Sequence, residues 1–308
     1  MSFDKSEHLN DVLESYKMKH VQDLMDKYIK KRNQVKDALD KKYSDKKATS
    51  AINSGSYAKH TAINIKFDID LCQPFKYGSF STLEEMADDV YNYFKNEYKD
   101  NELAKYAIRK QRVSTGLTFY IDGQEVKMDV VPGRELSNDD YTETNRLNLY
   151  VRPKSETQAT YTQTNIQEHI NHIKGRIKER NVIRLLKIWR CNKNKDIKSF
   201  FIELITIRAF GNCRSVSTDL WEQLKMTMEF IRDNVKSIRL VDPANSNNVV
   251  SETMSDLEKE NLANDMKNML ERIEENSENL KIYFAKNEKF AKKEEKQGAT
   301  ILTTKSFS

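Results

Sequence analysis

The sequence predicts an α+β fold, with a mixed sheet and flanking helices in the first half of the chain and a helical lobe in the second. Two observations carry this prediction. Before Pro153, apolar residues alternate with polar ones in several short segments, which is the spacing of half-buried strands. After Pro153, apolar residues recur three or four positions apart, which is the spacing of amphipathic helices.

The first half is predicted to contain a long amphipathic helix, a strand, a second helix and a hairpin. These elements span Leu9 to Leu39, Phe67 to Leu71, Leu83 to Tyr98, and the strand pair Val113 to Phe119 and Glu125 to Val131. Thr82 and Glu85 have the spacing of a helix cap. Asp122-Gly123 is a turn-forming pair, so the two strands around it are expected to form a hairpin.

The second half is predicted to be helical. The segments with helical spacing are Ile166 to Cys191, Ser199 to Phe210, Thr218 to Ile238 and Leu257 to Phe284. We therefore expect residues 1–155 to form a core with a long N-terminal helix and residues 156–285 to form a helical lobe. Residues 286–308 lose apolar periodicity and are expected to form a mobile tail.

Composition is typical of a soluble enzyme-sized chain. It has 308 residues, of which 38% are hydrophobic and 32% charged, so a substantial core and a densely charged surface are expected. Neither an apolar run of about 20 residues nor a secretion signal is visible, so we expect a cytoplasmic protein without membrane contact. The net charge of +5 does not by itself indicate nucleic-acid binding.

Three aspartates are the candidates for chemistry. Asp68 and Asp70 lie two apart in the predicted strand, so both side chains point to one face, and Asp129 lies in the second strand of the predicted hairpin. Such carboxylates repel one another unless a cation neutralises them, and hard oxygen ligands suit Mg²⁺ or Mn²⁺. Three of them can hold two ions, one activating an attacking hydroxyl and one neutralising a departing pyrophosphate.

Gly55-Ser56 is the candidate phosphate-binding turn, because glycine lets the backbone approach a phosphate closely and the serine hydroxyl adds a donor. Each of these pieces alone is weak evidence, since an Asp-x-Asp pair is commonly a solvated strand edge. Asp129 is stronger evidence for a functional site, because a carboxylate in an apolar strand is costly to bury without a partner. It is the order and spacing of all the pieces that favours nucleotidyl transfer.

Four segments carry a family resemblance. SGSYAKHTAINIKFDIDL resembles the signature of the polymerase-beta nucleotidyltransferase superfamily, and specifically of the cGAS/DncV-like nucleotidyltransferases (CD-NTases) of bacterial anti-phage (CBASS) signalling. VKMDVVP resembles their third-aspartate strand, and LLKIWRCNKNKDIKSFFIEL their helical-lobe segment. VDPANSNNV is similar to a segment of the oligoadenylate synthetase relatives, so the resemblance spans roughly residues 50 to 260. It implies a polymerase-beta-like core with a helical lobe of the oligoadenylate synthetase/cGAS type.

The resemblance also implies roles for the acidic and glycine-serine positions. Asp68 and Asp70 would bind two Mg²⁺ or Mn²⁺ ions, and Asp129 would bind the ion that activates the acceptor hydroxyl. Gly55 and Ser56 would hold the phosphates of the donor nucleotide.

Further positions are implied in the helical lobe. Lys187 resembles the lysine that contacts the triphosphate, although a solvated charge is the alternative interpretation. Ser199 and Phe200 resemble a serine that contacts phosphate and an aromatic residue that stacks on a base, with core packing as the alternative for Phe200. The chain departs from the pattern at His60, where relatives have glycine before Thr61, so the turn there is expected to be altered.

The implied function is the joining of nucleoside triphosphates (ATP, GTP or UTP) into a cyclic dinucleotide or trinucleotide second messenger, with release of pyrophosphate. A downstream effector would read the product, and the enzyme is expected to be a monomer. Two alternatives stay open: an RNA- or tRNA-tailing nucleotidyltransferase, and an inactive scaffold that binds nucleotide or RNA.

Two basic groups could contact an RNA activator, although ordinary solvated helix surfaces explain most such runs. The groups are Lys174, Arg176, Lys178, Arg180, Arg184, Lys187 and Arg190, and Lys105, Arg109, Lys110 and Arg112.

Overall fold

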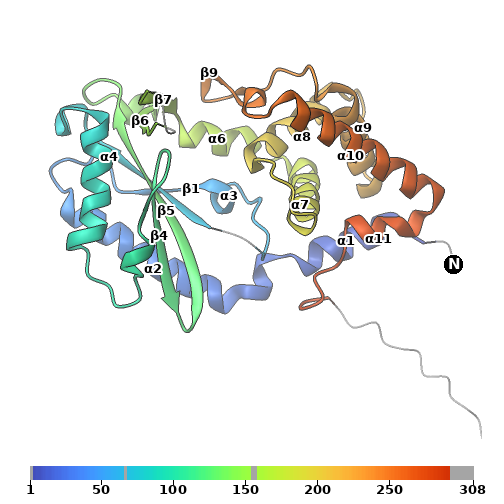
Figure 1. Cartoon of the computed structure of the whole chain (residues 1–308), viewed down its shortest axis with the longest axis horizontal. Coiled ribbons are helices and arrows are strands. Elements are labelled where there is room, and N and C mark those ends of the chain that lie inside the picture. Colours follow the sequence, from blue (N-terminus) through green and yellow to red (C-terminus); the bar gives the residue numbers. More distant parts are fainter. Residues whose placement is uncertain (1–2, 66–67, 154–157, 292–308) are drawn as a thin grey trace, which may run out of the picture.

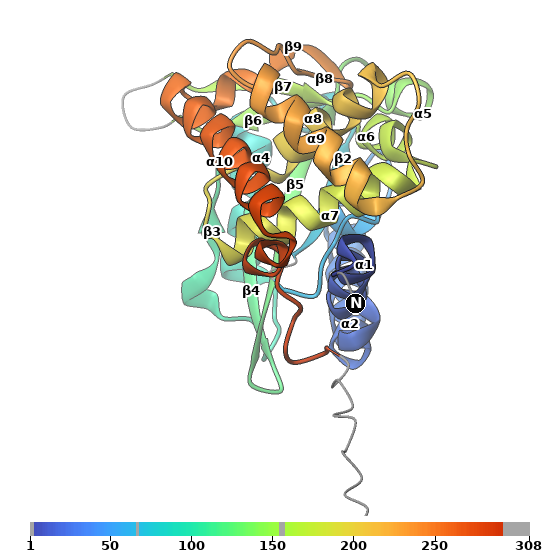
Figure 2. The same ribbon diagram turned by 90° about the vertical axis from the view of Figure 1, so that its right-hand side faces the viewer.

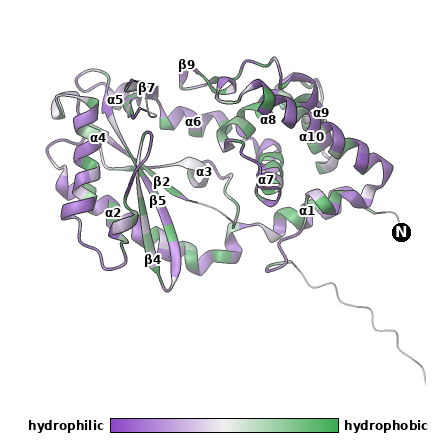
Figure 3. Cartoon of the chain, viewed as in Figure 1, coloured by the Kyte–Doolittle hydropathy of each residue, from purple (hydrophilic) through white to green (hydrophobic). Residues whose placement is uncertain are grey.

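The computed structural model describes residues 3–65, 68–153 and 158–291, which form two lobes with separate hydrophobic cores (Figure 1). One lobe is built on a sheet and the other consists mainly of helices, so the predicted α+β class is confirmed. Hydrophobic residues are distributed through both lobes (Figure 3). Within these residues, no helix has the length and apolar character that a bilayer crossing requires.

The first lobe contains a seven-stranded mixed sheet in the order β1-β2-β5-β4-β3, with β6 joining β5 to β7. Its strands are β1 (Ile52–Ser54), β2 (Ile69–Phe75), β3 (Arg109–Lys110), β4 (Thr115–Ile121), β5 (Gln124–Glu135), β6 (Leu147–Val151) and β7 (Thr160–Thr164). The pairing of β2 with β5 is parallel and the other pairings are antiparallel. The predicted β4–β5 hairpin is confirmed, with Asp122 and Gly123 both at positive φ.

Helices pack around this sheet and share its core. They are α2 (Gln22–Lys42), α3 (Gly55–Ala58), α4 (Leu83–Asn92), the π turn η3 (Tyr93–Glu97) and α5 (Tyr141–Thr144). The predicted cap of α4 is confirmed, because the Glu85 amide donates to Thr82 Oγ1 over 3.0 Å. The strands β1, β3, β6 and β7 were not predicted. β7 lies beyond residue 155 and still pairs with the core sheet.

The prediction of one long N-terminal helix is wrong. The chain forms α1 (Lys5–Ser15), a 3-10 turn (Met18–Val21) and α2. Asn64 explains the break, because its backbone and side-chain amides donate to the carbonyl oxygens of Ser15, Tyr16 and Lys17, which a continuous helix would use internally. As a result, α1 packs in the helical lobe, as Figure 2 shows, and only α2 packs against the sheet.

Within the described residues, the second lobe contains α1, six further α-helices, two 3-10 turns (Val250–Thr253 and Ser277–Asn279) and a small hairpin. The six further helices are α6 (Ile166–Ile173), α7 (Ile177–Asn192), α8 (Ser199–Asn212), α9 (Leu220–Asn234), α10 (Asp256–Glu275) and α11 (Leu280–Tyr283), and the hairpin strands are β8 (Val241–Asp242) and β9 (Asn245–Val249). Gly175, at φ +77°, separates α6 from α7, where one helix was expected. The hairpin falls on the VDPANSNNV segment and was not predicted.

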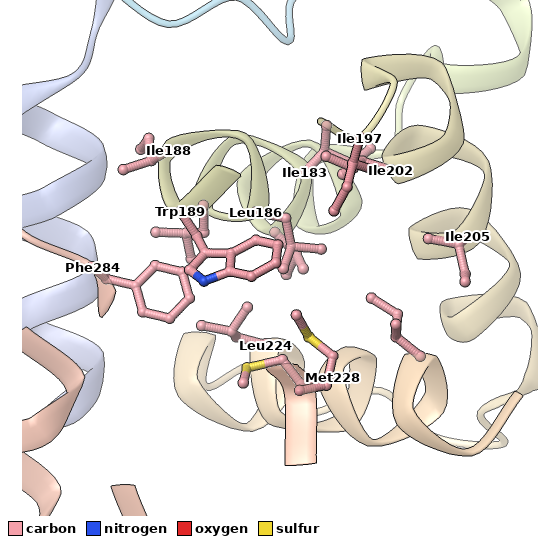
Figure 4. Close-up of a cluster of buried hydrophobic side chains, with 14 of the residues drawn as sticks. Ile183, Leu186, Ile188, Trp189, Ile197, Ile202, Ile205, Leu224, Met228 and Phe284 are labelled. Atoms are coloured by element: carbon pink, nitrogen blue, oxygen red, sulfur yellow. The ribbon is translucent and has the colours of Figure 1, made fainter. Parts of the chain in front are cut away.

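The core of this lobe is densely packed (Figure 4). Trp189 of α7 lies among Phe284 and the α9 residues Leu224 and Met228, and all four side chains are buried. The chain then returns to α1, where Lys286 forms a 2.8 Å ion pair with Asp11. Residues 286–291 of the expected tail are therefore held against the folded part, whereas residues 292–308 lie outside the described residues.

Shortening Leu224 to alanine should destabilise the protein by about 2–5 kcal/mol, because the side chain is fully buried and its removal leaves a cavity. The same change at Leu257, which is 67% exposed, should alter the free energy of unfolding by less than about 0.5 kcal/mol. Chemical denaturation of both variants tests the helical core. Equal changes in the free energy of unfolding for the Leu224 and Leu257 variants would contradict the burial of Leu224 in the helical core.

His60 has φ +55°, a left-handed conformation that favours glycine. The histidine thus holds a backbone conformation that glycine adopts without strain, and the expected alteration of the turn stays a prediction. A non-glycine residue in this conformation lowers the free energy of unfolding by roughly 1–2 kcal/mol through strain in the folded state. Replacement by glycine removes this strain but lowers the free energy of unfolding by about 0.5–1 kcal/mol, because glycine has more conformational entropy in the unfolded state. His60→Gly should therefore raise the free energy of unfolding by about 0.5–1 kcal/mol, whereas His60→Ala should not. Thermal denaturation decides between strain and a stabilising role of the imidazole.

Candidate functional site

Asp70 and Asp129 lie side by side at the centre of the sheet. In the parallel pairing of β2 with β5 they are direct partners, and neighbouring strands are about 4.8 Å apart. Ser54 of β1 is the partner of Asp70 on the other side, and Gly116 of β4 is the partner of Asp129. The register therefore brings together two carboxylates that are 59 positions apart in the chain.

The carboxylates of Asp70 and Asp129 carry like charges and are held close together. Burial raises the pKa of Asp70 to about 7, and the charges of Asp129 and Asp68 add to the shift, whereas Lys59 opposes it. Burial also raises the pKa of Asp129 to about 6, with the charge of Asp68 contributing. Asp68 is exposed and precedes β2, which begins at Ile69, yet its charge acts on both partners. A bound cation would reduce the electrostatic repulsion among all three carboxylates.

Asp129 is held in place by a neighbouring amide. Gln111 Nε2 donates to Asp129 Oδ1 over 3.0 Å, and Ser114 Oγ donates to Gln111 Oε1 over 2.6 Å. A Cβ at Gly116 would lie 2.6 Å from Gln111 Nε2, so this glycine makes room for the amide. No motif or spacing in the sequence points to Gln111, and the only available signal is that a partly buried Asp129 needs a hydrogen-bond partner.

Gly55 faces Asp70. A Cβ at Gly55 would collide with the Asp70 carboxylate, and Gly55 has φ +69°, so both space and backbone conformation require glycine. Gly55 begins the short helix α3, as expected for the glycine-serine turn. The carbonyl oxygen of Ser56 accepts from the Thr61 amide over 2.9 Å, which closes the turn.

A cavity of about 350 Å³ opens beside these residues. Its lining is Ser54, Gly55, Lys59, Asp70, Gln111, Arg112, Val113, Ser114, Asp129, Val131, Ile166, His169, Ile170 and Phe200. One part is acidic and the other is apolar and aromatic, with side chains from both lobes. Of the predicted site residues, Gly55, Asp70, Asp129 and Phe200 line it. Ser56, Asp68, Lys187 and Ser199 are not among the lining residues.

Lys59 links the two lobes at this cavity and was not predicted. Its Nζ lies 2.8 Å from Glu203 Oε2 of α8 and 5.0 Å from the centroid of the Phe200 ring. Glu203 is buried. Phe200 is half-buried, lines the cavity and also packs at the edge of the helical core, so its stacking on a base stays a prediction.

Lys187 and Ser199 make contacts inside the protein. Lys187 is buried, and its Nζ donates to Thr61 O over 3.1 Å and to Thr61 Oγ1 over 2.8 Å. Burial lowers the pKa of Lys187 to about 7. The alternative of a solvated charge is therefore wrong. Ser199 Oγ accepts from Arg190 Nη1 over 2.8 Å.

The chemistry of the donors fits Mg²⁺ or Mn²⁺, since three carboxylates supply hard oxygen ligands. However, no three His, Cys, Asp or Glu side chains within the described residues are gathered closely enough to hold a metal as they stand. Two observations account for this: the Asp70 carboxylate is turned toward Gly55, and Asp68 precedes the strand. A three-ligand site would need these side chains to rotate toward Asp129.

Comparisons with solved structures show the same fold. CdnC of E. coli MS115-1, in a structure with ATP, has a TM-score of 0.69 and 19% identity, covering 90% of this chain and 95% of that chain. Bradyrhizobium diazoefficiens CdnG in complex with GTP has a TM-score of 0.69 and 13% identity, covering 92% and 95%. Vibrio cholerae DncV cyclic AMP-GMP synthase has a TM-score of 0.59 and 11% identity, covering 79% and 69%. The expected CD-NTase fold is thus confirmed.

The sequence comparisons bear on the family. No curated protein matches the chain. The family model for the Second Messenger Oligonucleotide or Dinucleotide Synthetase domain matches residues 4–176. This range is more than half of the chain and includes the glycine-serine turn and all three aspartates. The chain therefore belongs to the Second Messenger Oligonucleotide or Dinucleotide Synthetase domain family and is a nucleotidyltransferase.

Proposed function

We propose that this nucleotidyltransferase joins nucleoside triphosphates into a cyclic dinucleotide or trinucleotide that acts as a second messenger in antiviral defence, with release of pyrophosphate. The observation that carries the proposal is the pairing of Asp70 with Asp129 at the acidic part of a nucleotide-sized cavity whose other part is aromatic. Family membership supports the second-messenger product.

Asp68, Asp70 and Asp129 are the residues that would hold two Mg²⁺ or Mn²⁺ ions. When bound, such ions lower the pKa of an attacking hydroxyl and neutralise the charge of a departing pyrophosphate. The protein's own contribution is orientation: Gln111 fixes the rotamer of Asp129 through its 3.0 Å hydrogen bond. Gly55 is proposed to hold the donor phosphates through its backbone, and its missing side chain leaves the room that the Asp70 carboxylate occupies.

The remaining site residues are proposed to position the substrate. Phe200 offers an aromatic face for a base, because it lines the cavity opposite the acidic pair. Ser56 and Ser199 would contact phosphate. Lys187 is proposed to act on the triphosphate indirectly, by holding Thr61 at the end of the turn that contains Gly55.

The substrates are proposed to be ATP, GTP or UTP, in keeping with the ATP and GTP complexes of the similar CdnC and CdnG structures. A separate effector would read the product, and the enzyme is proposed to act as a cytoplasmic monomer. For an RNA activator, the group around Arg109 and Arg112 is the better candidate, because both are exposed and Arg112 lines the cavity. In the other basic group, three side chains donate hydrogen bonds to carbonyl oxygens of the protein itself, namely Arg184, Lys187 and Arg190.

Asp70→Asn and Asp129→Asn should each lower pyrophosphate release from mixed NTPs and Mg²⁺ by at least about 100-fold, because metal ligation supplies several kcal/mol of charge stabilisation. Asp139→Asn is the matched control, since Asp139 is exposed and its left-handed backbone tolerates asparagine. Chromatography identifies the product. Extension of an added RNA would indicate a tailing enzyme instead, and NTP binding without any pyrophosphate would indicate an inactive scaffold.

The raised pKa of Asp70 predicts a pH-dependent stability difference in chelator-treated protein. The folded pKa is about 7, above the value of about 3.9 for an unfolded aspartate, so the penalty on the folded state builds up as the pH rises from about 4 to 7 and is complete above pH 7. Asp70→Asn should therefore be more stable than the parent protein at pH 8, and the difference should shrink toward pH 5. Melting curves with EDTA measure this, and Mg²⁺ should then raise the Tm of the parent only. If the stability difference between Asp70→Asn and the parent does not change with pH, the raised pKa of Asp70 is contradicted.

A further inference from the structure

Two aromatic rings form a corner in the apolar part of the cavity. His169 of α6 and Phe200 of α8 both line it, their ring centroids are 5.1 Å apart, and their planes are inclined by 62°. Ile166 and Ile170 complete this part of the wall. A flat base that stacks on one ring of such a corner presents its edge to the other ring. His169 is therefore placed to contact the base edge.

The tautomer that a neutral His169 ring adopts follows from its partner. The His169 Nε2 atom lies 2.7 Å from Asp242 Oδ1, which accepts hydrogen bonds only. The proton of the neutral imidazole is thereby placed on Nε2, and Nδ1 keeps the lone pair. In this tautomer, His169 can offer a hydrogen-bond acceptor to a ligand.

Asp242 is itself held rigidly. Its Oδ1 also accepts from the Ala244 amide over 2.8 Å, and its Oδ2 accepts from Asn248 Nδ2 over 3.0 Å. Burial would raise the pKa of Asp242, but the hydrogen bonds from His169, Ala244 and Asn248 lower it overall, so the group is a carboxylate at neutral pH. The hairpin that carries it is tied to β7, because Asn245 Nδ2 donates to Gln163 O over 3.1 Å.

These contacts indicate a structural role for the VDPANSNNV segment. Its one aspartate, Asp242, orients an imidazole in the cavity, Asn248 fixes that aspartate, and Asn245 fixes the hairpin. An ordinary surface hairpin would not need a buried carboxylate, and Asp242 is only 5% exposed. The arrangement resembles the way in which proteins fix the tautomer of a functional histidine through its second nitrogen.

We propose that His169 selects the nucleobase by accepting a hydrogen bond from an exocyclic amino group, and that Asp242 is the positioning residue that keeps Nδ1 available for it. The inference rests on the nucleotide site proposed above. Adenine, cytosine and guanine carry such an amino group, whereas the only edge donor of uracil lies between two carbonyl oxygens that a lone pair would repel. The site thus favours an amino-bearing NTP over UTP.

The test is calorimetric binding of each of the four NTPs to the full chain in Ca²⁺, which needs no turnover. At least one amino-bearing NTP should bind about tenfold more tightly than UTP, as expected for one well-placed hydrogen bond. His169→Ala should abolish this preference and leave tripolyphosphate binding unchanged. His172→Ala is the matched control on the same helix, since His172 is absent from the cavity lining, and it should keep the preference.

Variants of Asp242 separate positioning from simple support of the fold. Asp242→Ala should lose the preference, whereas Asp242→Asn should keep most of it, because an amide oxygen can still accept from both Ala244 and His169. Asn245→Ala loosens the hairpin from β7 without removing the contact to His169, and should also keep the preference.

The outcomes distinguish this inference from the function on which it rests. Equal affinity of the parent for UTP and the other NTPs, or an unchanged preference in His169→Ala, overturns the inference even if a cyclic product forms. Selective binding without product overturns only the proposed synthesis. A failure of every NTP to bind overturns both.

Discussion

The parallel pairing of β2 with β5 is the constraint on which the site depends, because it sets Asp70 directly beside Asp129. Two partly buried carboxylates in adjacent strands are unfavourable, and their raised pKa values express that cost. The surroundings are nonetheless shaped to keep them there: Gly55 has no side chain that could displace Asp70, and Gly116 leaves room for the amide that orients Asp129. A local conflict of this kind, supported by its neighbours, is typical of a functional site.

The helical lobe contacts a short segment next to this site. Each of residues 59–61 is held by a side chain of that lobe: Glu203 pairs with the lysine, Arg184 donates to the histidine carbonyl, and Lys187 donates to the threonine. This segment directly follows the glycine-serine turn. Three adjacent contacts therefore tie the helical lobe to the turn that faces Asp70.

The sequence predicts those parts of the structure that depend on local patterns. Alternation located the β4–β5 hairpin and placed Asp70 and Asp129 in strands, and Thr82 marked the start of α4. Asp68, expected in the same strand as Asp70, precedes β2. What these patterns missed depends on contacts between distant segments. Asn64 interrupts the N-terminal helix from 49 positions away, and the burial of Lys187 follows from its contact with a loop of the other lobe. Likewise, no spacing rule connects His169 with Asp242, which is 73 positions further along the chain.

The central claim is that the three aspartates bind divalent cations together. Electron paramagnetic resonance of Mn²⁺, titrated into the protein with a non-hydrolysable NTP analogue, measures the bound ions directly. The account predicts two bound ions for the parent chain and the loss of at least one when either Asp70 or Asp129 is replaced by asparagine. Identical Mn²⁺ binding in the parent and both variants would contradict it.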